Sequence, residues 1–181
     1  PTFLFRGNDP LTFRANIDTN ATNPVFSVLS TSTLNINDSG GGKITGSGTV
    51  SVNSSGTGGL VFSGTNDYSG GTRLMAGILR ASNASAFGTG TLTLEGGIVR
   101  GWGVDVTLGN AVSILGNVQI GESTTPRLTF NGITTLTGLR TLTIVNSTTS
   151  NSTIFNGQIA EAVGGSGIIK LGAARVVFGS G

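Results

Sequence analysis

Carboxylates are the side chains of this sequence with the greatest capacity for catalysis. Enzymes that cleave glycosidic bonds use two of them, one as an acid and one as a base or nucleophile. Asp18 and Asp38 are about 20 positions apart and Glu95 and Asp105 about half that, so a coiled chain with about 20 residues per turn would stack the first pair. We expect the acids to be loop and turn residues, with a carbohydrate lyase or hydrolase as the alternative. The full set is Asp9, Asp18, Asp38, Asp67, Glu95, Asp105, Glu122 and Glu161.

Trp102 is the only tryptophan of the chain and lies between Gly101 and Gly103. An exposed tryptophan between glycines would offer a flat ring on which a sugar can stack. The alternative is an aromatic side chain in the core or at a corner of the fold. We treat Trp102 as the candidate ligand contact, and a glycan-binding role follows if the ring is exposed.

The chain has no cysteine and no histidine. Disulfides, thiolate nucleophiles, Ser-His pairs and the usual zinc sites are therefore excluded. Asp38, Asp67 and Asp105 could ligate calcium, but the glycine-rich nonapeptide repeats of calcium-binding β-helices are absent. We expect no metal and no cofactor, and the prediction is that this protein is not an enzyme.

The charge pattern gives no sign of nucleic acid or membrane as a partner. Ten basic and eight acidic residues leave a net charge of +2, and the basic residues are scattered along the sequence. Nucleic-acid binding needs a basic patch, so we do not expect it. No stretch of 18 apolar residues occurs, so we expect no membrane insertion of this segment.

Glycine punctuates the sequence at short intervals. There are 31 glycines in 181 residues, against 4 prolines, and many short runs of Val, Ile, Leu and Phe lie between them. Short apolar runs with glycine at the corners predict short β-strands in stacked coils. No amphipathic stretch of helix length is present, so the prediction is an all-β solenoid.

Residues 58–81 are the most informative stretch. Their core runs from Leu60 to Thr72 and is followed by a glycine-led apolar run at Gly77. This stretch resembles the passenger-associated repeat of bacterial autotransporters, which has the form L-x-x-S-G-x-N-x-Y-x-G-x-T followed by G-x-L. The residues that carry the resemblance are Leu60, Phe62, Ser63, Gly64, Asn66, Tyr68, Gly70, Thr72, Gly77 and Leu79.

The resemblance implies a right-handed, single-stranded parallel β-helix. It also implies an exported chain, extracellular or on the outer-membrane surface of a Gram-negative-type bacterium. At about 20 residues per coil we expect about nine coils. Alternation predicts a core of Leu60, Phe62, Leu74, Ile78, Leu92, Leu94, Val106, Leu108, Ile114, Leu128, Phe130, Leu142, Ile144 and Phe155.

A longer internal repeat is also predicted. Residues 10–62 resemble residues 127–178, with offsets near 117, and the matches include Leu11-Thr12-Phe13 with Leu128-Thr129-Phe130. We expect residues 1–181 to be one continuous β-helix segment, taken from a longer tandem array.

These observations predict a structural or adhesive surface module. Coils without polar caps would leave open strand edges at both ends, so we expect self-association by end-to-end stacking or contact with neighbouring repeats, which gives a fibre or filament shaft. Host or matrix glycans are a further predicted partner. The alternatives are a carbohydrate-active enzyme and a glycan-binding module built on Trp102.

Overall fold

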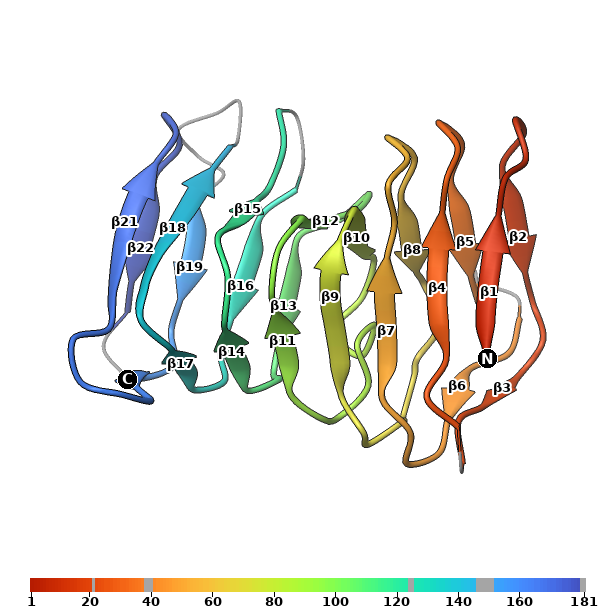
Figure 1. The fold of residues 1–181 in the computed structure, drawn as a ribbon, viewed down its shortest axis with the longest axis horizontal. Coiled ribbons are helices and arrows are strands. Elements are labelled where there is room, and N and C mark those ends of the chain that lie inside the picture. Colours follow the sequence, from red (N-terminus) through yellow and green to blue (C-terminus); the bar gives the residue numbers. More distant parts are fainter. Residues whose placement is uncertain (21, 38–40, 124–125, 146–151, 180–181) are drawn as a thin grey trace.

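The chain folds as a parallel β-solenoid. The computed structural model describes residues 1–20, 22–37, 41–123, 126–145 and 152–179. Successive coils lie side by side along one axis, with the N-terminus at the right-hand end of Figure 1 and the C-terminus at the left. All strand pairings are parallel, and the described residues contain strands and turns but no helix, hence no helix that could cross a membrane. The predicted all-β parallel β-helix is confirmed.

Two eight-stranded sheets run from one end of the solenoid to the other. Sheet A consists of β1 (Thr2–Phe5), β4 (Val25–Val28), β7 (Val50–Asn53), β9 (Thr72–Ala76), β11 (Leu92–Leu94), β14 (Val112–Ile114), β17 (Thr134–Leu136) and β20 (Ile159–Glu161). Sheet B consists of β2 (Leu11–Phe13), β5 (Leu34–Ile36), β8 (Leu60–Phe62), β10 (Ile78–Ala81), β12 (Ile98–Gly101), β15 (Val118–Ile120), β18 (Leu139–Ile144) and β21 (Gly167–Leu171).

The third side changes its structure along the axis. Sheet C, at the N-terminal end, pairs β3 (Ile17–Asp18) with β6 (Ile44–Thr45). Sheet D, at the C-terminal end, consists of β13 (Val106–Leu108), β16 (Leu128–Phe130), β19 (Thr153–Phe155) and β22 (Val176–Phe178). Between these sheets, residues 63–71 and 82–91 cross the third side without forming a strand. The central turn of the passenger-like motif, from Ser63 to Gly70, lies in this gap.

The solenoid has about seven turns, slightly fewer than the predicted nine. The prediction assumed a uniform coil of about 20 residues. That spacing holds from Thr72 to Leu92 and from Leu92 to Val112. The coils toward both ends are longer, since Val25 has Ser51 as its register partner and Thr134 has Ile159. The additional residues lie in the corner loops. Eight strands at about 4.8 Å give a sheet about 34 Å long.

The core is a set of apolar columns, because each residue packs over its register partner in the next coil. In sheet A the column is Phe26, Val52, Leu74, Leu94, Ile114 and Leu136. In sheet B it is Leu34, Leu60, Leu79, Val99, Ile120 and Ile144. In sheet D, Phe130 stacks on Phe155 with ring centroids 5.0 Å apart. Every one of these side chains is buried, so the hydrophobic effect acts at each step of the stack.

The predicted core residues are buried with one exception. Ile78 is half-exposed, and Leu79 takes the inward position beside Leu60 and Val99. Two adjacent apolar residues in a strand point to opposite faces, and the sequence does not show which faces inward. Ile78 therefore lies on the outer face of sheet B.

The predicted 117-residue repeat stays a prediction. Its matched strands β5 and β18 both lie in sheet B, but β2 lies in sheet B and its match β16 in sheet D. The same holds for β8 and β22.

Neighbouring residues of β11 allow a test of the column packing. Replacing Leu94 with Ala should lower the free energy of unfolding by about 2–5 kcal/mol, because it leaves a cavity between Leu74 and Ile114. Thr93→Ala, on the outer face of the same strand, should cost less than about 1 kcal/mol. Urea unfolding followed by circular dichroism measures both, and equal losses would contradict the column packing.

Candidate functional site

Asn66 connects three successive coils where the third side has no strand. Its side-chain oxygen accepts a hydrogen bond from the Ile44 amide of the preceding coil at 2.8 Å. Its amide nitrogen donates to the Ala86 carbonyl of the following coil at 2.7 Å. The side chain is buried, so these bonds satisfy backbone groups that water cannot reach. One side-chain amide thus replaces two bonds of a missing strand ladder.

Tyr68 is fully buried at the end of the same turn. Its hydroxyl lies 2.5 Å from Thr72 Oγ1, and Thr72 Oγ1 lies 3.1 Å from the Phe87 carbonyl oxygen. A carbonyl only accepts, so Thr72 donates to Phe87 and Tyr68 donates to Thr72. Burial raises the pKa of Tyr68 above its ordinary value of 10.0, and the bond to Thr72 offsets part of that increase. Tyr68 is therefore a packing residue.

The glycines of the motif allow adjacent coils to approach closely. A Cβ on Gly70 would lie 2.4 Å from backbone atoms of Ser47 and Gly48. Gly77 has φ +91°, and a Cβ there would lie 2.5 Å from Ser54 Cβ. Of the remaining motif residues, Leu60, Phe62, Thr72 and Leu79 are buried, Gly64 packs on Asn37, and Ser63 donates its backbone N–H to Ile36.

The amide ladder continues into the next coils, and the sequence analysis missed this. Asn83 donates to the Ser63 carbonyl at 2.8 Å, and Asn110 donates to the Gly90 carbonyl at 2.7 Å. Asn110 is buried like Asn66. The signal in the sequence was an asparagine in each successive polar turn of this region.

Trp102 follows β12 and is 41% exposed. Its ring is not free on all sides, because the Arg80 guanidinium carbon lies 4.6 Å from the ring centroid and that of Arg100 lies 5.5 Å away. Cation–π attraction therefore holds the ring against the sheet. The candidate contact residue is exposed, and two arginines that the sequence analysis did not single out support it.

Arg80 and Arg100 are register partners on β10 and β12. Only 6% of Arg80 and 5% of Arg100 are exposed. Burial, and after it the charge of Arg100, lowers the pKa of Arg80 to about 10. Burial also lowers the pKa of Arg100, which is paired with Glu122. The signal in the sequence was Ile78-Leu79-Arg80-Ala81 repeated as Ile98-Val99-Arg100-Gly101, one coil later.

An open groove of about 450 Å³ lies beside this cluster. It is lined by residues 54–57, Gly77, Ile78, Gly97, Ile98 and Glu122. It adjoins the cluster through Ile78, which lies two residues before Arg80 on β10, and through Glu122, which pairs with Arg100. The groove arises from a change in corner length between sheets A and B. The corner before β8 spans residues 54–59, whereas Gly77 alone connects β9 to β10.

The described acids do not form the catalytic pair considered as the alternative to loop and turn positions. Asp18 has Thr45 as its register partner, not residue 38, and its carboxylate accepts the Asn20 amide in a turn. Asp38 lies outside the described residues. Glu95 precedes β12 and pairs with Arg73, whereas Asp105 follows β12 and pairs with Arg127. The two carboxylates therefore lie at opposite ends of this strand.

Another acid, Asp67, also stands apart from other carboxylates. Asp67 pairs with Lys43 of the preceding coil. In the part of the chain that the structure describes, no group of three or more acids could hold a metal ion.

Tyr68→Phe should show the burial of the hydroxyl as a pH effect. At pH 7 the variant should be less stable by about 1 kcal/mol, because one buried hydrogen bond is lost. Above pH 10 only the unfolded wild-type chain loses the tyrosine proton, because the pKa of Tyr68 is raised in the folded state. The difference in the free energy of unfolding between the wild type and the variant should then fall by about 1.4 kcal/mol per pH unit.

The measurement is urea unfolding of both proteins between pH 7 and pH 11.5. The lowered pKa of Arg80 makes the folded state more stable as the pH rises, which is opposite to the effect of Tyr68. Arg80 is present in both proteins, so the difference between their unfolding free energies reports on Tyr68 alone. The order of stability should reverse within about one unit above pH 10. A difference that does not change with pH would show that the hydroxyl is solvated.

Comparison with known families identifies the repeat. A family profile described as Passenger-associated-transport-repeat matches residues 55–81, which include all ten motif residues named from the sequence. No curated protein and no solved structure matches the chain significantly. The matched repeat, in a parallel β-solenoid, fits an autotransporter passenger repeat protein and confirms the resemblance.

Proposed function

We propose that this chain is a rigid β-helical shaft of an exported bacterial protein, at the outer-membrane surface of a Gram-negative-type cell. The observation that carries the proposal is the continuity of sheets A and B through every coil. An uninterrupted stack resists bending because each coil shares backbone bonds and core columns with its neighbours. The passenger repeat at residues 55–81 supports the exported, surface location.

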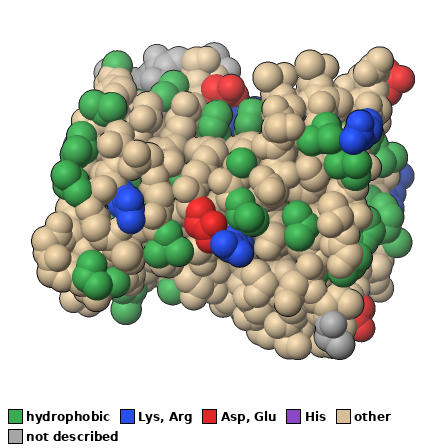
Figure 2. All heavy atoms as spheres, in the orientation of Figure 1, with side chains coloured by type: hydrophobic (Ala, Val, Ile, Leu, Met, Phe, Trp, Pro, Cys, Tyr) green, Lys and Arg blue, Asp and Glu red, His purple; other side chains and the backbone are tan. Residues whose placement is uncertain are grey.

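The outer surface suits display rather than catalysis. Figure 2 shows mostly neutral polar and backbone atoms on one face, with few charged groups. Some of the charged residues form ion pairs between coils, such as Arg73 with Glu95 and Lys43 with Asp67. These pairs fix the coil register and leave the polar corner loops as the contact surface for an adhesive role.

Immunogold labelling of intact cells that express the native gene tests the location. Antibodies against this segment should label the outside of unpermeabilised cells, and negative staining should show thin rods. Label that appears only after permeabilisation would contradict the proposal.

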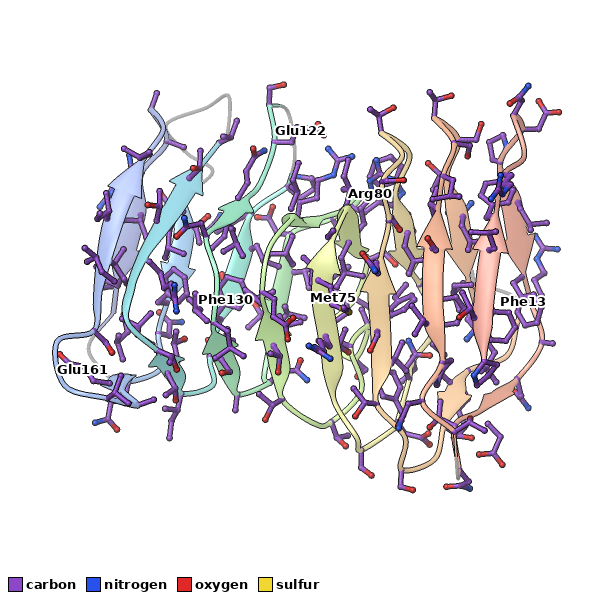
Figure 3. All side chains as sticks on the ribbon, in the orientation of Figure 1. Phe13, Met75, Arg80, Glu122, Phe130 and Glu161 are labelled. Atoms are coloured by element: carbon purple, nitrogen blue, oxygen red, sulfur yellow. The ribbon has the colours of Figure 1, made fainter. Side chains whose placement is uncertain are left out.

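The two ends of the solenoid expose apolar residues. At the N-terminal end an apolar hollow of about 230 Å³ is lined by side chains that include Phe3, Leu11 and Phe13. Phe3 is 38% and Leu11 47% exposed, and Figure 3 shows Phe13 at this end. At the other end Leu171 and Phe178 are half-exposed. Within this segment the outermost strands of sheets A and B, β1 and β2 at one end and β20 and β21 at the other, are paired on one side only. We propose that a second copy stacks head to tail on them, in the same way as a neighbouring repeat of a longer chain would.

Two charged residues interrupt the core columns on the C-terminal face. Glu161 is the register partner of Leu136, and Lys170 is the register partner of Leu142. Figure 3 shows Glu161 at this end. Inward charges on an exposed edge weaken edge-to-edge association, because the charges lose water when the edge is covered.

The double substitution Glu161→Leu and Lys170→Leu should therefore strengthen stacking. We expect sedimentation velocity to show filaments of the variant at protein concentrations at least about tenfold lower than for the wild type. Phe3→Glu, on the opposite face, should abolish stacking in both backgrounds. If wild type and double variant are both monomeric at high concentration, stacking of copies is wrong, while the shaft role still stands.

A further inference from the structure

The arginine cluster lies near the middle of the solenoid, away from both stacking faces. Figure 3 shows both Arg80 and Glu122 in the upper half of the view, with Glu122 nearer the top. Arg80 and Arg100 are directly paired across β10 and β12, and both are more than nine-tenths buried. Two guanidinium groups side by side in a buried position repel each other. An anion close to both would reduce this repulsion and stabilise the folded state.

The described chain supplies only one carboxylate to this pair of charges. Glu122 pairs with Arg100. No carboxylate of the described residues forms a salt bridge with Arg80, whose Nη1 donates to the Thr33 hydroxyl at 3.3 Å. The Nε atoms of both arginines are buried without a hydrogen-bond partner. A buried guanidinium with unsatisfied donors is costly, and it satisfies them best with a bidentate oxyanion.

The backbone is built to accommodate Arg80. A Cβ on Gly59 would lie 1.8 Å from Arg80 Nη1, so the absence of a side chain at residue 59 makes the space for the guanidinium. The guanidinium carbon of Arg80 lies over the Trp102 ring, 4.6 Å from the ring centroid. Cation–π contact uses the face of the guanidinium, whereas its N–H donors point outward in the plane of the group.

The surroundings favour a sugar as the carrier of the anion. Trp102 keeps 41% of its surface exposed, which leaves ring surface for stacking on the C–H face of a pyranose. The adjacent groove is lined by Ser55 and Thr57, which carry hydroxyl groups, and by the apolar side chains of Ile78 and Ile98. Hydroxyl donors and apolar side chains match the alternating polar and C–H surfaces of a saccharide.

We propose that this cluster, here called the Arg80–Trp102 site, binds an acidic glycan. The acid group of the sugar, a carboxylate or a sulfate, pairs with Arg80, the ring stacks on Trp102, and neighbouring sugar units lie in the groove up to Glu122. The proposal goes beyond the shaft role and does not depend on it, because the site lies within neighbouring coils of one chain and needs no second copy.

The tryptophan provides a direct readout, because Trp102 is the only tryptophan of the chain. Its fluorescence should change saturably on titration with trigalacturonate, which carries carboxylates, or with a heparin-derived tetrasaccharide, which carries sulfates. Maltotriose, which is neutral, should produce no change. The acid that binds identifies the chemistry of the group, and binding should weaken as salt increases.

Variants assign the signal to the cluster. Arg80→Gln should weaken binding at least about tenfold, because it removes the charge-assisted hydrogen bonds. Arg80→Lys keeps the charge without the planar fork and should bind with intermediate affinity, which also covers the case that the glutamine variant does not fold. Arg73→Gln is the matched control, an exposed and ion-paired arginine on sheet A, and should bind like the wild type.

Several outcomes would overturn the proposal. They are no fluorescence change with either acidic oligosaccharide, an equal response to maltotriose, or unchanged affinity in a folded Arg80→Gln protein. Sodium sulfate or poly-glutamate that binds as tightly as the oligosaccharides would show a general anion or acidic polypeptide site instead. Each of these results leaves the surface labelling and stacking experiments unaffected, so the two proposals fail independently.

Discussion

The structure depends on the hydrogen bonds that each coil makes to the coils on either side. In sheets A and B these are backbone bonds between parallel strands. On the third side the strands stop between sheets C and D. Isolated backbone bonds, such as that from the Ser69 N–H to the Gly46 carbonyl, continue there, and asparagine side chains add further bonds between the coils. Asn66 bonds both adjacent coils at once, and Asn83 and Asn110 extend the connection toward sheet D. Because a side-chain amide has both a donor and an acceptor, it can make the hydrogen bonds to both neighbouring coils that a strand would otherwise make. The passenger motif is therefore a device that keeps the coils in register where no strand does so.

The same register produces the core. Residues one coil apart occupy equivalent positions, so apolar residues form columns and the burial of each depends on the coils above and below. Within the stack every column position is covered, and at the two ends it is not. The end faces also differ from each other, since the N-terminal face presents Phe3 and Leu11 whereas the C-terminal face presents Glu161 and Lys170 among apolar residues. That asymmetry gives the stack a direction.

Register also explains the arginine cluster. A side chain repeated at the same position of two successive coils is placed beside its own copy, which stabilises stacks of leucine or phenylalanine but not stacks of arginine. The fold relieves part of the repulsion between Arg80 and Arg100 with Glu122 and Trp102, and the space at Gly59 holds the remaining guanidinium. The result is a buried positive charge next to an open groove, at the place where the corner loops become short.

The sequence by itself determined the fold class, the passenger repeat and nearly all of the core, because these follow from local patterns of alternation, glycine spacing and a contiguous motif. Only the tertiary structure decided the number of coils, the orientation of Ile78 and the partners of Trp102. Coil length depends on corner loops that have no periodic pattern and range from Gly77 alone to the whole of residues 54–59. Which of two adjacent apolar residues points into the core depends on the strand register. Arg80 contacts Trp102 only because their coils are stacked in space. Contacts of this kind are set by the distance between coils and not by neighbours in the sequence.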